Sequence, residues 1–284
     1  MRLRVMTGRD IPAGLRLNTL AGWNQTAVDW HRFLDLSPDG CFVMEHDTKV
    51  VGTATTISYE KRFAWIAMVL VDPEYRKQGI GTQLLTKTVE YLDQCDMPTM
   101  KLDATPLGKP LYEKMGFVSE FEIERLILKR PAKRVSTVPR SAGSPLDATE
   151  VEQIVRMDRE VFGADRGFLL RSLFGEAPEL ALTVREEGRP RGYAFGRRGA
   201  FADHLGPWMA TSRASAEALL HGFLAKSSRD IVIVDCVKSN AAALELLSAC
   251  GFTPSRPLTR MARGPNVFPG RPDSMCAILG PEFG

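Results

Sequence analysis

MVLVDPEYRKQGIGTQLL, residues 68–85, is the most informative segment of this chain. A strand-like apolar run ends at Val71, Asp72 and Pro73 turn the chain, and the run Arg76–Gly81 leads directly into a helical pattern. Because glycine lets the backbone approach a ligand closely and the first N–H groups of a helix have no partner, this loop suits a pyrophosphate. The segment lacks the Gly-Lys-Ser/Thr of a P-loop and the full GxGxxG of a dinucleotide site. Taken alone, it also fits an ordinary glycine-bearing turn between a strand and a helix.

The same order of elements occurs twice in the 284 residues. Leu102–Phe117 and Val234–Phe252 each read as a strand, a polar corner, a short helix and Gly-Phe. Upstream of each, a hairpin pattern is followed by a third strand and an amphipathic helix. These strand–helix pairs are Phe63–Val71 with Gly81–Gln94, and His204–Ala210 with Ser215–Lys226. The repeat predicts a mixed α/β fold of two related domains, residues 1–130 and 149–284. A linker at 131–148, rich in Pro, Ser, Gly and basic residues, joins them.

The composition is that of an ordinary globular protein, with 44% hydrophobic and 25% charged residues. The 37 basic and 34 acidic side chains nearly cancel and are interleaved, so nucleic-acid binding is unsupported. No uncharged apolar run approaches the roughly 18 residues of a membrane span. The first residues lack the apolar core of a signal peptide, and five scattered cysteines fit buried thiols in a reducing compartment. We therefore expect a cytoplasmic protein without nucleic-acid or membrane partners.

In this context the segment resembles the acyl-CoA-binding motif of the GNAT N-acetyltransferase superfamily, Arg/Gln-x-x-Gly-x-Gly/Ala after the fourth strand. Arg76, Gly79 and Gly81 match the motif, and the resemblance in strand order covers roughly residues 1–128. It implies a tandem GNAT acyl-CoA N-acyltransferase fold, in which loop N–H groups hold the CoA pyrophosphate and the preceding strand pairs with the pantetheine arm. The residues it implies for acetyl-CoA binding are Val69, Leu70, Val71, Arg76, Lys77, Gln78, Gly79, Ile80, Gly81 and Thr82.

Tyr112 lies in PLYEKMGF, residues 110–117, on the short helix after the next strand. This run is similar to the GNAT segment whose tyrosine protonates the CoA thiolate. A phenol stays protonated near neutral pH, so it suits the role of a general acid. The alternative is a helix tyrosine with its hydroxyl at the surface. The spacing from the glycine loop favours the catalytic role.

Asp103 ends the strand before this helix and is the candidate general base, or the group that binds a cationic amine. A carboxylate that caps the following turn is an equally good interpretation. The turn 103–108, DATPLG, has no Asn where many GNAT proteins carry one, which leaves that side-chain contact to the pantetheine without a candidate. The first two helices wall the acceptor site in the family, so Trp23 and Asn24 are candidates for substrate binding, as is Glu60 at a strand end. A core tryptophan and a solvated acid are the structural alternatives.

The second half keeps the order of strands and helices but lacks the glycine loop and the tyrosine of the first half. Aligning the two Gly-Phe landmarks puts Leu247 in the place of Tyr112, and the loop Thr211–Ser215 has no glycine. The half resembles the degenerate C-terminal domain of two-domain bacterial GNAT proteins. We expect it to have a structural or substrate-shaping role, including closure of the acceptor cleft of the first half.

These observations predict a cytoplasmic N-acetyltransferase that uses acetyl-CoA as cosubstrate and no metal. The amine would attack the thioester directly in a ternary complex, because positioning alone supplies much of the rate. The alternative is a non-catalytic acyl-CoA-binding sensor or regulatory protein, which has no need of a phenol beside the thioester. A small molecule or a protein could supply the amine, and a monomer and a homodimer both fit.

Overall fold

The computed structural model of the chain describes residues 1–130 and 143–284. The helices and strands of the first half are β1 (Arg2–Val5), α1 (Ile11–Ala21), α2 (Ala27–Leu36), β2 (Phe42–His46), β3 (Lys49–Tyr59), β4 (Phe63–Val71), α3 (Ile80–Gln94), β5 (Met100–Ala104), α4 (Lys109–Lys114) and β6 (Val118–Lys129). Those of the second half are β7 (Ser144–Pro145), α5 (Val151–Phe162), α6 (Gly167–Glu176), β8 (Leu182–Glu186), β9 (Arg189–Arg198), β10 (Asp203–Ala210), α7 (Arg213–Lys226), β11 (Ile231–Val237), α8 (Ala241–Ala249), β12 (Thr253–Arg263) and β13 (Met275–Ala277). Short 3-10 turns are η1 (Gly8–Asp10), η2 (Pro73–Tyr75), η3 (Ala148–Glu150), η4 (Pro178–Leu180) and η5 (Pro272–Ser274).

The order of elements from β1 to β6 is repeated from β7 to β12, which confirms the mixed α/β fold and the internal repeat. The strand predicted at 63–71 is β4, and the helix predicted from Gly81 is α3, which begins one residue earlier. Of the predicted linker 131–148, residues 131–142 lie outside the described residues. Ser144 and Pro145 form β7, which pairs with β8.

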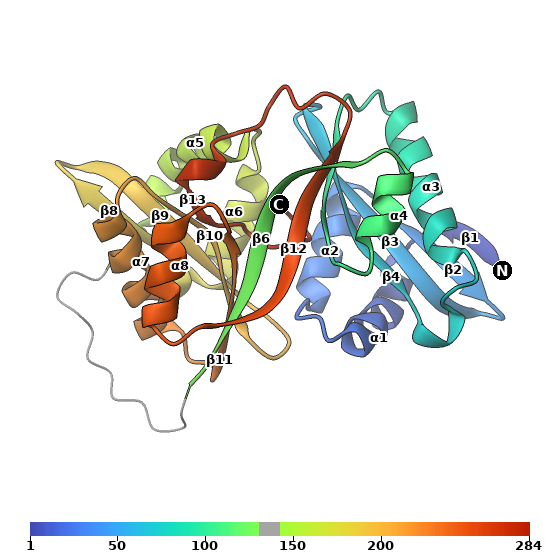
Figure 1. Ribbon diagram of the computed structural model, residues 1–284, viewed down its shortest axis with the longest axis horizontal. Helices are drawn as coiled ribbons and strands as arrows, with labels where there is room; N and C mark the ends of the chain where they lie inside the picture. The colour runs from blue at the N-terminus through green and yellow to red at the C-terminus, as the bar shows by residue number, and fades with distance from the viewer. Residues whose placement is uncertain (131–142) are drawn as a thin grey trace.

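The strands of the described residues form one sheet in the order β1-β2-β3-β4-β5-β12-β6-β11-β13-β10-β9-β8-β7. β12 of the second half lies between β5 and β6 of the first, and β6 pairs in turn with β11 of the second half. Figure 1 shows β6 and β12 side by side between the two halves. The two halves are therefore separate in sequence but exchange a strand in space.

The parallel strands β4 and β5 pair only at Ala64–Met100 and Trp65–Lys101. Beyond Trp65 they diverge, which leaves one backbone edge of β4 without a ladder partner. The equivalent strands of the second half, β10 and β11, also pair over a short stretch that ends at Leu205. There β13 enters between them and pairs with both strands. The opening is thus free in the first half and filled in the second.

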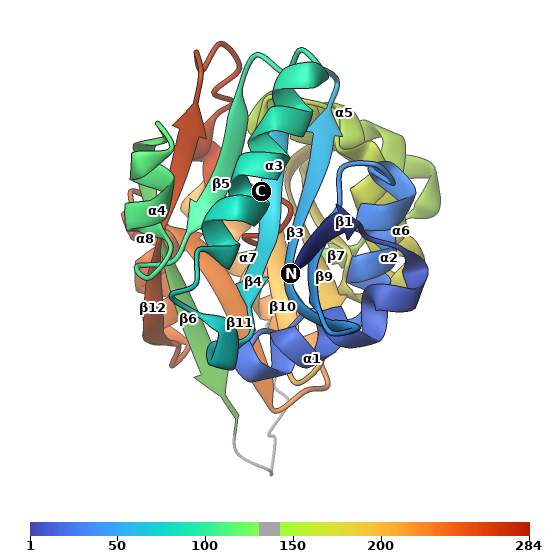
Figure 2. The same cartoon turned by 90° about the vertical axis from the view of Figure 1, so that its right-hand side faces the viewer.

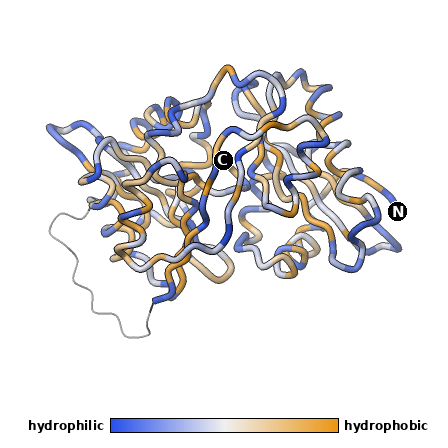
Figure 3. The backbone as a smooth tube through the Cα atoms, viewed as in Figure 1, coloured by the Kyte–Doolittle hydropathy of each residue, from blue (hydrophilic) through white to orange (hydrophobic). Residues whose placement is uncertain are grey.

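Helices cover both faces of the strands of the first half. Figure 2 shows α1 and α2 on one side of these strands and α3 on the other. For this reason residues 50–57 of β3 are all buried, without the alternation of a half-exposed strand. Figure 3 shows hydrophobic segments inside each half and hydrophilic ones on the outer loops.

One core cluster joins the halves, because it combines side chains of α2, β3 and β4 with those of α5, α6 and the segment 278–283. Phe33 stacks on Phe283 with ring centroids 5.1 Å apart, and Tyr59 meets Phe162 edge-on at 5.0 Å. In the described part of the chain no helix has the length and apolar character needed to cross a membrane.

Candidate active site

A cavity of about 1280 Å³ opens where β4 and β5 diverge. The first half lines most of it, with β4, the start of α3, the turn before α4, α4 itself and the loop after α1. The remaining wall consists of Arg125 on β6, Arg256 and Leu258 on β12, and Pro281 and Glu282. Ligand pockets commonly measure about 300–1,000 Å³, so this cavity has room for two substrates at once. Both halves of the chain therefore build it.

The glycine loop forms one end of the cavity. Gly79 is the N-cap of α3 and has a φ of +78°, a left-handed conformation that glycine adopts without strain. The first hydrogen bond of the helix runs from the Gln83 N–H to the Gly79 carbonyl at 3.0 Å. Within the described residues, no acceptor takes the N–H groups of Ile80, Gly81 and Thr82. These donors and the positive end of the helix dipole make an anion site.

A distortion of β4 shapes the middle of the cavity. Met68 has a φ of +52° and sits at a register shift between β3 and β4. The Thr53 hydroxyl donates a 2.7 Å hydrogen bond to the Met68 carbonyl and holds this bulge. A bulge re-aims the strand that follows it, and here that strand, Val69–Val71, lines the cavity. Of the ten residues that the resemblance implies for acetyl-CoA binding, only Gln78 does not line the cavity.

Tyr112 lines the cavity from α4 and packs edge-on against Phe117, with ring centroids 6.1 Å apart. A Cβ on Gly108 would lie 2.8 Å from the Tyr112 ring, so the absence of a side chain there makes room for the phenol. Burial raises the pKa of Tyr112 to about 12. The phenol therefore carries its proton throughout the physiological range, as a general acid must.

Asp103 also lines the cavity, but its carboxylate is fully buried and already paired. Its two oxygens accept hydrogen bonds from Arg260 of β12 at 2.9 and 2.8 Å. Burial raises the pKa of Asp103, and the Arg260 guanidinium only partly opposes the effect. The pairing crosses between the halves at directly opposed residues of β5 and β12.

The three candidate substrate residues have different surroundings. Trp23 lines the cavity. Asn24 points away, because its side chain accepts from the N–H groups of Phe201 and Ala202 and donates to the Ala202 carbonyl, each at 3.1 Å. Glu60 pairs with Arg159 at 2.8 Å and accepts from the Asp165 N–H, and neither Asn24 nor Glu60 lines the cavity. Both residues instead fasten the first half to the second.

Sequence patterns missed the cavity residues on the two interleaved strands, β6 and β12. Arg125 and Arg256 are opposed across β6 and β12. Their side chains can share a wall only because β12 has inserted beside β6. The alternation Arg256, Leu258, Arg260 along β12 was the available signal, since alternate residues of a strand face the same side. The signal identifies a common face but not the partner strand.

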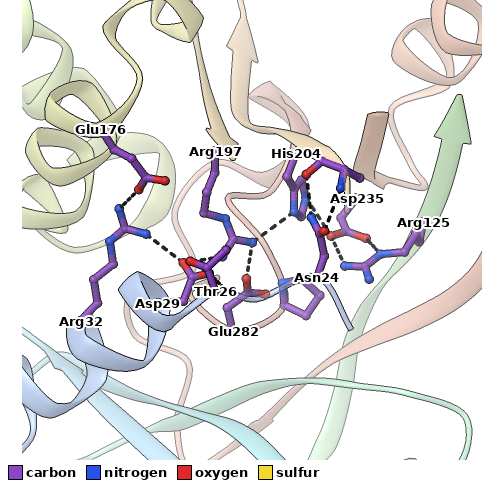
Figure 4. Close-up of polar contacts among 12 residues, drawn as sticks. Asn24, Thr26, Asp29, Arg32, Arg125, Glu176, Arg197, His204, Asp235 and Glu282 are labelled. Carbon is purple, nitrogen blue, oxygen red and sulfur yellow. Dashed lines mark hydrogen bonds and ion pairs between the residues drawn. The ribbon is translucent and has the colours of Figure 1, made fainter. Parts of the chain in front are cut away.

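A row of buried charges runs between the halves and reaches the cavity at Arg125 and Glu282 (Figure 4). Glu176, Arg32, Asp29 and Arg197 alternate in charge, and His204 then connects Arg197 to Asp235, which pairs with Arg125. Arg197 also pairs with Glu282. Burial alone would raise the pKa of Asp29 and of Asp235, but neighbouring guanidinium groups hold the pKa of both carboxyls below the usual range.

The second half lacks an equivalent of the phosphate loop. Ser212 is the N-cap of α7, and its side chain accepts from the Ser215 N–H at 3.1 Å, which satisfies a donor that is free in α3. Leu247, in the place of Tyr112, is fully buried. Asn240 donates to the Met275 carbonyl of β13 at 3.1 Å. Among the described residues no group of three His, Cys, Asp or Glu side chains could hold a metal ion.

Comparisons with known proteins agree with this arrangement. A family model described as "Acetyltransferase (GNAT) family" matches residues 15–117, and one described as "Acetyltransferase (GNAT) domain" matches residues 154–276. A holothin acyltransferase from Pseudoalteromonas sp. is 23% identical over 264 residues, which cover 92% of this chain and 87% of the relative. A mycothiol acetyltransferase from Acidimicrobium ferrooxidans is 30% identical over 141 residues, covering 44% of this chain and 46% of the relative. The crystal structure of a putative acetyltransferase from Pyrococcus horikoshii superposes with a TM-score of 0.80 at 24% identity, over 100% of this chain and 95% of that one.

Proposed function

The chain belongs to the GNAT acetyltransferase family, with one such domain in each half, and we propose that it transfers an acetyl group from acetyl-CoA to a primary amine bound in the same cavity. Acyl-CoA-dependent acyl transfer is the chemistry of the family. The observation that carries it is the single cavity that joins the unpaired N–H groups of α3 to Tyr112.

The first half has what is needed to hold acetyl-CoA. The loop Arg76–Thr82 would bind the pyrophosphate through backbone N–H groups. The free edge of β4 at Val69–Val71 would pair with the amides of the pantetheine arm, as an added strand does. In the second half β13 takes up the corresponding opening, so we propose one acyl-CoA site for the whole chain.

The proposed reaction is a direct displacement. The amine nitrogen attacks the thioester carbon, the carbon–sulfur bond breaks, and Tyr112 donates its phenolic proton to the leaving thiolate. Bound side by side, the two substrates react as an intramolecular pair, which removes much of the entropic barrier. We propose a positioning role for Asp103, since its carboxylate is fully buried and both of its oxygens accept hydrogen bonds from Arg260.

We propose a small-molecule amine as the acceptor and Trp23 as one of its contacts. The cavity lies between the halves, and residues of β12 and of the segment 281–282 close its acceptor end. The two curated relatives described above carry names that refer to holothin and mycothiol. A cavity lined from both halves suits a compact acceptor better than a protein surface.

Release of free thiol from acetyl-CoA in the presence of a panel of primary amines tests the function. The proposal requires thiol release that depends on one of the amines and yields the acetylated amine in equal amount. Tight binding of CoA without turnover of any amine would instead support the sensor interpretation.

A further inference from the structure

Two charged side chains at the acceptor end of the cavity have donor or acceptor atoms that no other protein group satisfies among the described residues. They are Arg256 on β12 and Glu282, in the segment that follows β13. Both come from the second half and both line the cavity. A buried ionic group without a full set of partners is costly, so each needs a reason to be there.

Arg256 has no ion-pair partner among the described residues, and its buried Nε has no hydrogen-bond acceptor. Its guanidinium lies 6.0 Å from the centre of the Trp23 ring. Burial, and then repulsion by Arg125, lower the pKa of Arg256 to about 10, so the side chain still carries its charge at neutral pH. The cavity therefore presents a cation that lacks an anion.

Arg125, in contrast, is not free to bind a further anion. Asp235 accepts from it twice, at 2.7 Å each, and neutralises it. Arg260 is likewise neutralised by Asp103. Of these three arginines, Arg256 alone has no carboxylate partner within the described residues.

Glu282 is 3% exposed, and the segment on either side of it is pinned to the first half. Trp65 Nε1 donates to the Pro281 carbonyl at 2.9 Å, and the Tyr59 hydroxyl donates to the Phe283 carbonyl at 2.8 Å. The carboxylate forms an ion pair with Arg197, which also serves Asp29, and its remaining lone pairs have no donor among the described residues. Figure 4 shows Glu282 beside Arg197, within the charge row.

We infer that the acceptor is an aminocarboxylate, whose carboxylate pairs with Arg256 and whose ammonium group pairs with Glu282. The inference rests on the proposed function for the direction of acetyl transfer, but not for the binding of the acceptor. One guanidinium matches one carboxylate in a two-pronged contact. An acceptor without a carboxylate would leave Arg256 without an anion, which penalises such an acceptor.

Glu282 would then also act as the general base that deprotonates the acceptor ammonium group. The ammonium group transfers one proton to the Glu282 carboxylate, and the free amine attacks the thioester carbon. As the carbon–sulfur bond breaks, the thiolate takes the proton of Tyr112, and the second nitrogen proton passes to the Tyr112 phenolate as the amide forms. Glu282 then releases its proton to solvent. An ammonium group thus becomes an amide N–H, the thiolate becomes a thiol, and both side chains return to their starting protonation states.

Matched acceptors test the pairing with Arg256. Glycine and β-alanine are compared with glycinamide and β-alaninamide, which keep the amine but lack the negative charge of the carboxylate. We expect the wild type to prefer an acid over its amide, and Arg256→Gln to raise KM for that acid by about 10- to 100-fold, the range for one charged hydrogen-bonded contact. KM for acetyl-CoA stays unchanged. Arg263→Gln on the same strand is the matched control, since Arg263 faces Asp93 outside the cavity.

Turnover and binding separate this inference from the proposed function. Titration calorimetry of each acid and its amide into the CoA complex reports acceptor binding even when no thiol is released. Acids that bind no better than their amides, or a preference that survives Arg256→Gln, would overturn the inference while leaving acetyl transfer to other amines intact.

Glu282→Gln should lower kcat by about 100-fold or more, as expected for loss of a base. Activity should recover partly at high pH, where the amine is already neutral. An unchanged pH profile would remove Glu282 from the reaction.

Discussion

Tyr112 is the residue on which the proposed chemistry depends most. Its phenol lines the cavity with no carboxylate partner among the described residues, and burial keeps it protonated with a pKa raised to about 12. We predict that Tyr112→Phe lowers kcat by about 10- to 1,000-fold, the order expected for one general acid, with little change in KM for acetyl-CoA. Steady-state thiol release measures both constants. Tyr91→Phe on α3 is the control, and an equal loss in both variants would contradict the assignment.

Single functional residues could be predicted from the sequence where their neighbours along the chain form a motif. Tyr112 and the loop Arg76–Gly81 are each recognisable from a few neighbouring residues. Arg256 and Glu282 are not, because they reach the cavity only through strand exchange and through the path of the segment after β13. Asn24 was expected at the substrate and instead binds the loop 199–202, since nothing in its neighbours indicates which loop of the other half faces it.

Among the elements, the start of α3 carries the binding of the cosubstrate. Gly79 has a φ of +78°, where an L side chain costs about 1–2 kcal/mol. We predict that Gly79→Ala raises KM for acetyl-CoA, because relief of this strain turns the N–H groups of α3 away from the pyrophosphate. Gly175→Ala in α6 is the matched control, since its φ is ordinary and a Cβ there meets nothing within 4 Å. An unchanged KM for acetyl-CoA in Gly79→Ala would contradict this assignment of the loop.

Most elements could be predicted because their patterns are periodic. β4 and α3 lie where the apolar run and the amphipathic stripe placed them. The bulge at Met68 could not be predicted, since methionine has no preference for a positive φ and the conformation follows from the contact with Thr53. The role of β13 was also hidden, because a three-residue strand has no periodicity to detect.

On the scale of the whole molecule, the strand exchange makes the halves interdependent. Without the second half, β5 loses its ladder to β12 and β6 loses its ladders to both β11 and β12. We predict that residues 1–130 expressed alone do not form a stable monomer, because the freed edges invite aggregation. Size-exclusion chromatography and circular dichroism measure the outcome. A folded, active 1–130 monomer would show that the halves are independent domains.

The buried charge row predicts a pH dependence of stability. The pKa values of Asp29 and Asp235 are lower in the folded chain than the value of about 3.9 in the unfolded chain. Their contribution to the free energy of unfolding is therefore complete above that pH and is lost as pH falls below it. Urea unfolding between pH 3 and 7 should show a steep loss below about pH 4. Glu152→Gln, at an exposed pair with Arg171, should leave the profile unchanged, and a flat wild-type profile would contradict the assignment.

Strand exchange is the part of the fold that periodicity could not reveal, because a strand pattern states which face is buried and not which strand lies alongside. β6 and β12 carry equivalent patterns in the repeat, and pairing within one half or between halves satisfies both. The acceptor end of the cavity depends on this choice, so the first half of the site was predictable and the second was not.

The most direct test of a cavity shared by both halves is a crystal structure of the chain with CoA bound. Pyrophosphate oxygens should lie within hydrogen-bond distance of the N–H groups of Ile80 to Thr82, and the thiol should lie beside the Tyr112 hydroxyl. The path beyond the sulfur should lead to Glu282 and Arg256. CoA bound at α7 of the second half, or a thiol directed away from Tyr112, would contradict this arrangement.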